Sequence, residues 1–356
     1  MSGAISLAMG EPDAGTPPRI RDAAVKALAD GRTRYAAITG SAPLREALAE
    51  RLSKQSGLAL DDRNVVVTHG GSAGLASAVL ALVRPGDRVL VPEPTYSLYV
   101  DHLAMVGAEA VWISNLPDGT LDLERIAAEA PKARMIVLCN PVNPTGAVFG
   151  QSDVRGLGAI LASNPGLFLL SDEAYRDIVF DGVPFTSAMS LTDVIDRVVL
   201  VGTFSKSYAM TGWRLGFACA APAVAASINL VHRTLNGPMN TFVQDAGRVA
   251  LDIEDDELEE LARSYERRRD LVMSFLNEMP TVSVVPPQGA FYAFPRIDSG
   301  LTSGQLAGRF AEGGVLVRAG SEFGPSGEGH VRLSFATDEA SLREGMRRFA
   351  EVVKEL

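Results

Sequence analysis

The stretch "NVVVTHGGSAGLASAVLALVRPGDRVLVPEP", residues 64–94, has the pattern that decides the fold class. It holds an apolar, β-branched run, a glycine-rich turn, an apolar helical segment and a second apolar run. Apolar strands that alternate with helices are typical of a mostly parallel sheet covered by helices on both faces. The same pattern continues in four further apolar runs, at 109–114, 134–141, 167–175 and 197–203. The sequence therefore predicts an α/β fold.

The pattern changes after residue 250. Residues 255–279, "DDELEELARSYERRRDLVMSFLNEM", have apolar residues at helical spacing and predict one long amphipathic helix. Short strand-like segments and a closing helix follow it, which is a mixed α+β arrangement. We therefore predict a large domain over residues 33–252 and a smaller α+β domain formed by residues 1–32 and 253–356.

Composition excludes several classes of partner. The 356 residues have a formal net charge of −10 without acidic or basic blocks, which argues against binding to nucleic acid or an anionic membrane surface. We recognise no leader sequence and no run of about 18 apolar residues, so we expect a cytoplasmic protein. Cys139 and Cys219 are flanked by apolar residues and are expected to be buried thiols, with no disulfide and no metal site.

The functional residues are expected where the strands end, because ligands of open α/β sheets bind beyond the carboxyl ends of the strands. The first run ends in "THGGSAG", residues 68–74, which leads directly into a helix. Free N–H groups at a helix start, together with the Ser72 hydroxyl, favour an anion such as phosphate. A simple tight turn is the alternative. A dinucleotide site is less favoured because the first half of the G-x-G-x-x-G motif is missing.

The other strand ends add a varied set of side chains. They present Tyr96, Asn143 in "NPVNPTG", Asp172 in "SDEAY" and Lys206 in "TFSKSYAMTGWRLG". Each has an ordinary structural alternative, such as packing for Tyr96 and helix capping for Asp172. Together they offer an amine, a phosphate cradle, a stacking ring and a buried carboxylate. Pyridoxal phosphate requires this combination: an amine that forms its Schiff base, an anchor for its phosphate and a carboxylate beside its ring nitrogen.

The sequence also resembles the fold-type I, class I/II aminotransferases, particularly the bacterial aspartate and aromatic aminotransferase branch. The resemblance covers nearly the whole chain. It is carried by the motifs "SLAMGEPD", "RYAAITGSAPLREALAE", "NPVNPTGAVF", "SDEAYRDIVF", "FSKSYAMTGWRLGF", "GAFYAF" and "HVRLSFAT". It implies transfer of an amino group from an L-amino acid to a 2-oxo acid, with pyridoxal 5′-phosphate as the cofactor.

The resemblance also implies roles for individual residues. Lys206 matches the lysine that forms the Schiff base and moves the substrate proton. The residues that match the phosphate-binding positions are Gly71, Ser72, Ala73, Thr203, Ser205 and Arg214. Those that match the groups around the cofactor ring are Tyr96, Asn143, Asp172 and Tyr175.

Further matches concern the substrate and a second subunit. Arg332 matches the arginine that binds the substrate α-carboxylate, with Gly10 and Asn143 beside it. Tyr35 matches a tyrosine that reaches the phosphate of the neighbouring subunit, which implies a homodimer. Asn240 is a weaker candidate for the same role.

Other outcomes remain open at this stage. The same residues are compatible with a pyridoxal phosphate-dependent lyase, or with an oxygen-dependent oxidase or decarboxylase. A non-catalytic sensor domain is disfavoured by the negative charge. Side-chain selectivity is expected from Met9, Ile38, Thr39 and Tyr96. The role of Arg318 is open between a contact to an acidic substrate group and an ordinary surface position.

Overall fold

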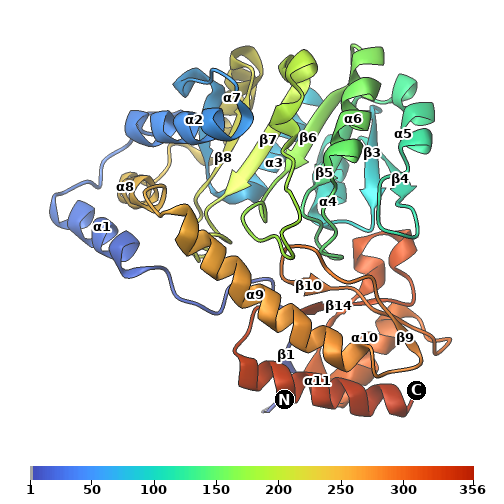
Figure 1. Ribbon diagram of the computed structural model, residues 1–356. Coiled ribbons are helices and arrows are strands. Elements are labelled where there is room, and N and C mark those ends of the chain that lie inside the picture. The colour runs from blue at the N-terminus through green and yellow to red at the C-terminus, as the bar shows by residue number, and fades with distance from the viewer. Residues whose placement is uncertain (1–2) are drawn as a thin grey trace.

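The computed structural model describes residues 3–356 and has a large sheet with helices on both sides, next to a smaller α+β unit (Figure 1). In the described residues the large sheet has seven strands in the order β2-β8-β7-β6-β5-β3-β4. All of them run in the same direction except β8, which is antiparallel to both of its neighbours. The strands are β2 (Val65–Thr68), β3 (Arg88–Glu93), β4 (Glu109–Ser114), β5 (Met135–Cys139), β6 (Phe168–Asp172), β7 (Val198–Thr203) and β8 (Gly216–Ala220). This confirms the predicted mostly parallel sheet.

Alternate residues of the central strands are buried in two separate cores. Val137 of β5, for example, faces one core, and its neighbour Leu138 faces the other. The helices on the Val137 side are α3 (Gly70–Leu82), α4 (Leu98–Val106) and α7 (Pro222–Asn236). Those on the Leu138 side are α2 (Ala42–Ser56), α5 (Leu123–Glu129), α6 (Gln151–Ser163) and α8 (Thr241–Ala250). Both faces of the sheet are therefore covered, which is why its strands are apolar throughout.

The smaller unit is built around a three-stranded antiparallel sheet in the order β10-β14-β13. Its strands are β10 (Tyr292–Ala293), β13 (Arg318–Ala319) and β14 (Val331–Ser334). Short strand pairs lie beside it, namely β1 (Ile5–Ser6) with β12 (Val315–Leu316), and β9 (Val282–Ser283) with β11 (Arg296–Ile297). Its helices are α9 (Asp255–Leu276), α10 (Ser303–Glu312) and α11 (Glu339–Lys354). The predicted long helix after residue 250 is thus α9.

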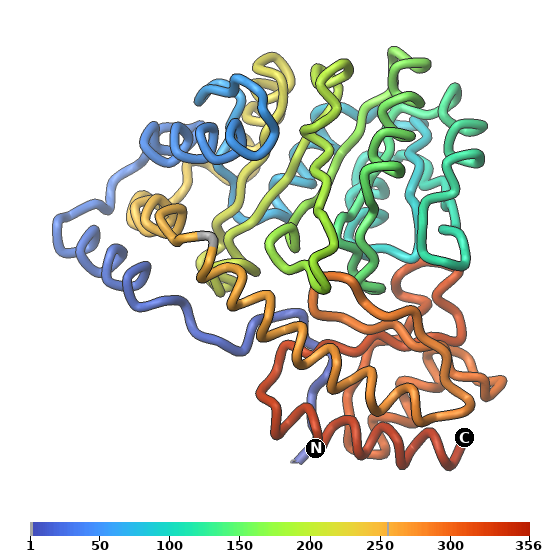
Figure 2. The backbone as a smooth tube through the Cα atoms, viewed as in Figure 1, coloured from blue at the N-terminus to red at the C-terminus, as the bar shows by residue number. Residues whose placement is uncertain are grey.

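The N-terminal segment divides between the two units (Figure 2). Strand β1 pairs with β12 of the smaller unit. Helix α1 (Pro18–Ala29) instead packs against α8, and its Ile20 and Ala24 are buried in a core of the large sheet. The predicted boundaries placed all of residues 1–32 with the smaller domain. The structure instead shows the apolar face of α1 packed against the larger unit.

No helix within residues 3–356 is both long and apolar enough to cross a membrane.

Candidate active site

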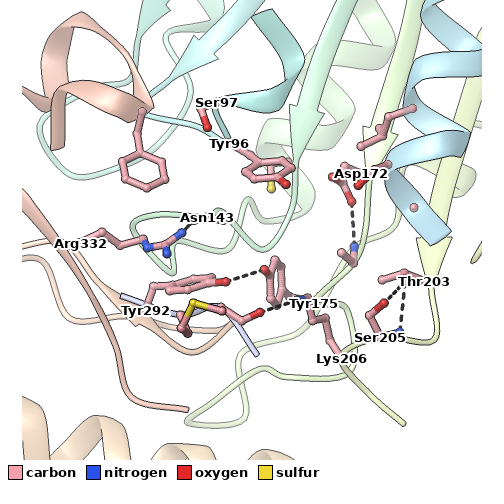
Figure 3. Close-up of a pocket in the computed structure, with 18 of the residues that line it drawn as sticks. Tyr96, Ser97, Asn143, Asp172, Tyr175, Thr203, Ser205, Lys206, Tyr292 and Arg332 are labelled. Carbon is pink, nitrogen blue, oxygen red and sulfur yellow. Dashed lines mark hydrogen bonds between the residues drawn. The ribbon is translucent and has the colours of Figure 1, made fainter. Parts of the chain in front are cut away.

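A cavity of about 360 Å³ lies at the carboxyl ends of β3, β5, β6 and β7, where the large sheet meets the smaller unit (Figure 3). A volume of this size suits a small organic ligand. It brings together most of the residues predicted from the strand ends and motifs. These are Gly10, Gly71, Ser72, Tyr96, Asn143, Asp172, Tyr175, Thr203, Ser205, Lys206, Arg214 and Arg332.

One end of the cavity is formed by the N-terminus of α3. Gly70 has a φ of 76°, and a Cβ added to it would lie only 2.7 Å from Nη2 of Arg214. The guanidinium of Arg214 therefore lies directly over the start of the helix. On the other side, the Thr203 hydroxyl donates to the Ser205 hydroxyl at 2.9 Å. Helix N–H groups, two hydroxyls and a guanidinium form a cradle for an anion.

Lys206 extends into the middle of the cavity. Its Nζ donates to the Gly10 carbonyl oxygen at 2.6 Å, and it lies 5.8 Å from the centre of the Tyr175 ring. Burial is the main cause that lowers the pKa of Lys206 to about 8, and the nearby Arg332 adds to the effect. A substantial fraction of this amine is therefore neutral near pH 8, so it can act as a nucleophile or a base.

Asp172, at the end of β6, is buried and hydrogen-bonded on both sides. Its carboxylate accepts from the Tyr99 hydroxyl at 2.8 Å and from the Ala174 N–H at 3.1 Å. Burial raises the pKa of Asp172 to about 6, although both of these hydrogen bonds and the charge of Lys206 act in the opposite direction. Tyr99 was not predicted as a site residue. The sequence feature that could have identified Tyr99 is its position three residues after Tyr96, which places it on the buried face of α4.

The raised pKa of Asp172 has a measurable consequence for protein free of bound ligands. Between about pH 4 and pH 6 the unfolded chain releases the Asp172 proton while the folded chain retains it. The contribution of Asp172 to the free energy of unfolding is therefore fully present below pH 4 and is lost as the pH rises through 6. The substituted amide would not titrate, so the free energy of unfolding of Asp172→Asn should rise relative to that of wild type as the pH increases from about 4 to about 7. We expect this relative increase to reach about 3 kcal/mol.

Urea unfolding across this pH range measures that difference. The exposed Asp101→Asn substitution on α4 is the control for general charge effects. A difference between Asp172→Asn and wild type that stays constant with pH would show that the Asp172 carboxyl is not destabilised by burial.

Arg332, on β14, has a guanidinium held in a fixed plane. Nη1 donates to the Asn143 Oδ1 at 3.0 Å, and Nη2 donates to the Ala8 carbonyl oxygen at 2.6 Å. The guanidinium carbon lies 4.3 Å from the Tyr292 ring centre and 4.9 Å from that of Phe323. Among the described residues, its buried Nε has no hydrogen-bond partner. This rigid cation retains unused donor capacity, which suits a bound carboxylate.

Two phenols complete the wall between Lys206 and Arg332. The hydroxyls of Tyr175 and Tyr292 lie 2.8 Å apart in a hydrogen bond. Burial raises the pKa of both phenols above their usual range, so both remain neutral. Tyr292 lies in the motif "GAFYAF" and was not predicted as a site residue. The sequence feature that could have identified it is its position next to Phe291 in an aromatic run. It also faces Gly10, where an added Cβ would collide with the Tyr292 hydroxyl.

Five predicted residues lie outside the cavity, among them Ile38 and Thr39, which were expected to contribute to side-chain selectivity. Ala73 is on the first turn of α3 but does not line the cavity. Tyr35 is 92% exposed, and Asn240 is exposed at the start of α8. The two cysteines are buried free thiols, as predicted, and burial raises the pKa of each to about 12. Cys139 lies at the cavity wall in the unreactive protonated form.

Comparison with known proteins identifies the family. Residues 2–349 match the family described as aminotransferase class I and II. The chain is 38% identical to aromatic-amino-acid aminotransferase 2 of Thermococcus litoralis, over 100% of this chain and 93% of the relative. It is 36% identical to arginine–pyruvate transaminase of Pseudomonas aeruginosa, over 98% of this chain and 90% of the relative.

A solved structure agrees with these matches. The aspartate aminotransferase double mutant of Thermus thermophilus superimposes with a TM-score of 0.93 at 34% identity, over 98% of this chain and 92% of that one. The cavity at the strand ends and the sequence similarity over the full length lead to the same assignment. This chain belongs to the class I and II aminotransferases, pyridoxal phosphate-dependent enzymes that move amino groups between amino acids and 2-oxo acids.

Proposed function

We propose that Lys206, Asp172 and Arg332 are the three side chains that carry out amino transfer in this enzyme. The observation that supports this most strongly is their arrangement in one cavity. A partly buried amine with a pKa of about 8 shares this cavity with a buried carboxylate and a buried guanidinium. The amine and the carboxylate suit the cofactor, and the guanidinium suits the substrate.

The residues of the cavity fit pyridoxal phosphate at each of its polar groups. The cradle of Ser72, Thr203, Ser205 and Arg214 suits the phosphate, and a side chain at position 70 would fill part of that space. Lys206 would hold the cofactor covalently through Nζ. The Asp172 carboxylate would face the ring nitrogen, Tyr96 would lie against the ring, and Asn143 and Tyr175 would donate to its 3-oxygen.

When bound, the cofactor supplies an electron sink for the negative charge that develops at the substrate α-carbon. Asp172 contributes by holding a proton on the ring nitrogen, since its ionised form favours a cation beside it. Lys206 Nζ, released from the cofactor when the substrate amine takes its place, would accept the proton from the substrate α-carbon and would deliver it to the cofactor carbon on the other side of the substrate nitrogen. Arg332 fixes the α-carboxylate in the plane of its fork, which sets the orientation of the bond that breaks.

The phosphate cradle yields a prediction that depends on space alone. Gly70→Ala would place its Cβ 2.7 Å from the Arg214 guanidinium, whereas Gly86→Ala would meet no atom within 4 Å. Both glycines have a positive φ, 76° and 83°, so both substitutions carry similar backbone strain. We expect Gly70→Ala to weaken pyridoxal phosphate binding by roughly ten- to hundredfold, because a charge-assisted contact is lost. Gly86→Ala, the control, should bind as wild type does.

Absorbance titration of the protein freed of cofactor measures both dissociation constants. Equal affinity in Gly70→Ala and Gly86→Ala would contradict the placement of the phosphate against Arg214.

We also propose a homodimer in the cytoplasm. Two observations support the dimer: Tyr35 is exposed, and large apolar side chains are exposed on α1 and α7. These are Val25, Leu28, Leu230 and Leu235. Two buried free thiols agree with a reducing compartment. A monomer in analytical ultracentrifugation at assay concentrations would contradict the dimer.

We propose two domains within each subunit. Residues 33–252 form the large domain, and the remaining segments form the small one. Helix α1 is the exception and is assigned to the large domain, because Ile20 and Ala24 lie in its core.

A panel of single amino acids, each mixed with the holoenzyme without an oxo acid, tests the proposed function. We expect a productive donor to yield one 2-oxo acid per active site and then stop, and a 2-oxo acid to reverse the change. Continuing release of ammonia or peroxide would contradict amino transfer and would favour elimination or oxidation.

A further inference from the structure

The register of the small sheet places a second arginine beside Arg332. In the antiparallel pair β13–β14, Arg318 is directly opposite Arg332. Side chains directly opposite each other in such a pair project from the same face of the sheet. Both arginines accordingly line the same cavity. The cavity therefore has a deep arginine, Arg332, and a second arginine whose backbone position is directly opposite on the neighbouring strand.

Arg318 differs from Arg332 in its surroundings. Its side chain is 46% exposed and pairs with Glu322, which is itself 37% exposed. Arg332 is buried and is fixed by two hydrogen bonds and two aromatic rings. An ion pair that is exposed to water contributes little free energy, so Arg318 can exchange its carboxylate partner at little cost.

Glu322 has a second contact that keeps it in place when Arg318 leaves. Its Oε1 accepts from the Ala319 N–H at 3.1 Å. This N–H is free for that purpose because Gly320, the next residue, donates its N–H to the His330 carbonyl of the neighbouring strand. Successive N–H groups of a strand point in opposite directions, so the Ala319 N–H faces away from β14. Glu322 is thus anchored to the backbone, and only Arg318 has to move.

We propose that Arg318 is a specificity-determining residue that binds the side-chain carboxylate of a dicarboxylic amino acid or 2-oxo acid. The proposal rests on the function proposed above, in which Arg332 holds the α-carboxylate. A dicarboxylic substrate then spans the two arginines, with its second carboxylate replacing Glu322 as the partner of Arg318. A substrate with a neutral side chain leaves the Arg318–Glu322 pair intact.

The arrangement allows one cavity to accept both kinds of substrate. An aminotransferase must bind its donor and its acceptor in turn at the same site, and the two differ in their side chains. Without Glu322, Arg318 would stand uncompensated opposite Arg332, and like charges at such positions are destabilising. Glu322 neutralises that charge whenever the substrate brings none.

The test compares two acceptors of the same chain length with the holoenzyme. 2-Oxoglutarate has a distal carboxylate, and 2-oxopentanoate has a methyl group at that end. We expect Arg318→Gln to raise KM for 2-oxoglutarate by about two- to fivefold, because the contact that is lost is an ion pair of a half-exposed guanidinium. Its KM for 2-oxopentanoate and its kcat should change less than about twofold, since the contact holds the substrate without touching the reacting atoms.

Two further variants make the test specific. Glu322→Gln removes the competing carboxylate, so we expect KM for 2-oxoglutarate to fall by about two- to fivefold. Arg309→Gln is the matched control, because Arg309 has a side chain that is 45% exposed and also pairs with a glutamate, Glu312, but it lies outside the cavity. It should change neither KM.

Three outcomes would overturn the proposal. The first is that the wild-type enzyme transfers amino groups to 2-oxopentanoate but not to 2-oxoglutarate. The second is that Arg318→Gln changes both KM values equally, which would indicate a structural role. The third is that it changes neither. Failure of the function itself is distinguished from these, because it would abolish transfer to 2-oxopentanoate as well.

Discussion

Lys206→Ala is expected to abolish turnover while leaving pyridoxal phosphate bound through its phosphate. Lys206 is the one lysine among the described residues that line the cavity, and by the proposal above it forms the covalent link and moves the proton at the substrate α-carbon. The phosphate cradle of Ser72, Thr203, Ser205 and Arg214 is unchanged. General acid–base catalysis alone contributes roughly 10²- to 10⁴-fold, so we expect the rate to fall by at least about a hundredfold.

Two measurements check this prediction together. Steady-state assays give the rate, and borohydride reduction followed by mass spectrometry shows whether the cofactor is covalently attached. Lys54→Ala is the control, because Lys54 is an exposed lysine paired with Glu50 on α2. Turnover in Lys206→Ala at a rate near that of wild type would refute the assignment of Lys206.

Arg332→Gln is expected to lower kcat/KM by roughly a hundred- to thousandfold for every amino acid. The buried guanidinium offers a bidentate, charge-assisted contact to the α-carboxylate, and each such hydrogen bond contributes about 1.5–3 kcal/mol. Arg332→Lys should restore only part of the loss, because an ammonium group lacks the planar fork.

A substrate without an α-carboxylate separates binding from folding in this variant. Ethylamine is alanine without its carboxylate, and its slow reaction should be no slower in Arg332→Gln than in wild type. Unchanged cofactor absorbance and thermal unfolding would show that the variant is folded. Equal losses for alanine and ethylamine would contradict a carboxylate-binding role.

The sequence predicted the sheet and most of the cavity because both depend on local patterns. Each apolar run predicted one strand, and the polar residue after it, such as Asn143 or Asp172, was brought to the common edge by the parallel topology. Strand β8 was missed. Its sequence "GFACA" is short and rich in small residues, and it takes its place next to the edge strand β2 only through pairing with β2 and β7.

The features that could not be predicted depend on contacts between distant segments. Tyr99 is hydrogen-bonded to Asp172, which is 73 positions away in the sequence, and Tyr292 is hydrogen-bonded to Tyr175, which is 117 positions away. The Arg318–Arg332 pair follows from the strand register, which no local pattern in "GVLVRAG" or "HVRLSFAT" determines. The contact between α1 and α8 also joins distant segments, so the sequence did not reveal that α1 packs against the larger unit.

The fate of the donor nitrogen tests the central claim most directly. The holoenzyme is mixed with a ¹⁵N-labelled amino acid from the donor panel and an unlabelled 2-oxo acid, and the products are followed by mass spectrometry. Amino transfer predicts that the label appears in the amino acid derived from the acceptor, in equal amount to the oxo acid derived from the donor. Label released as free ammonia, with none in the new amino acid, would contradict it.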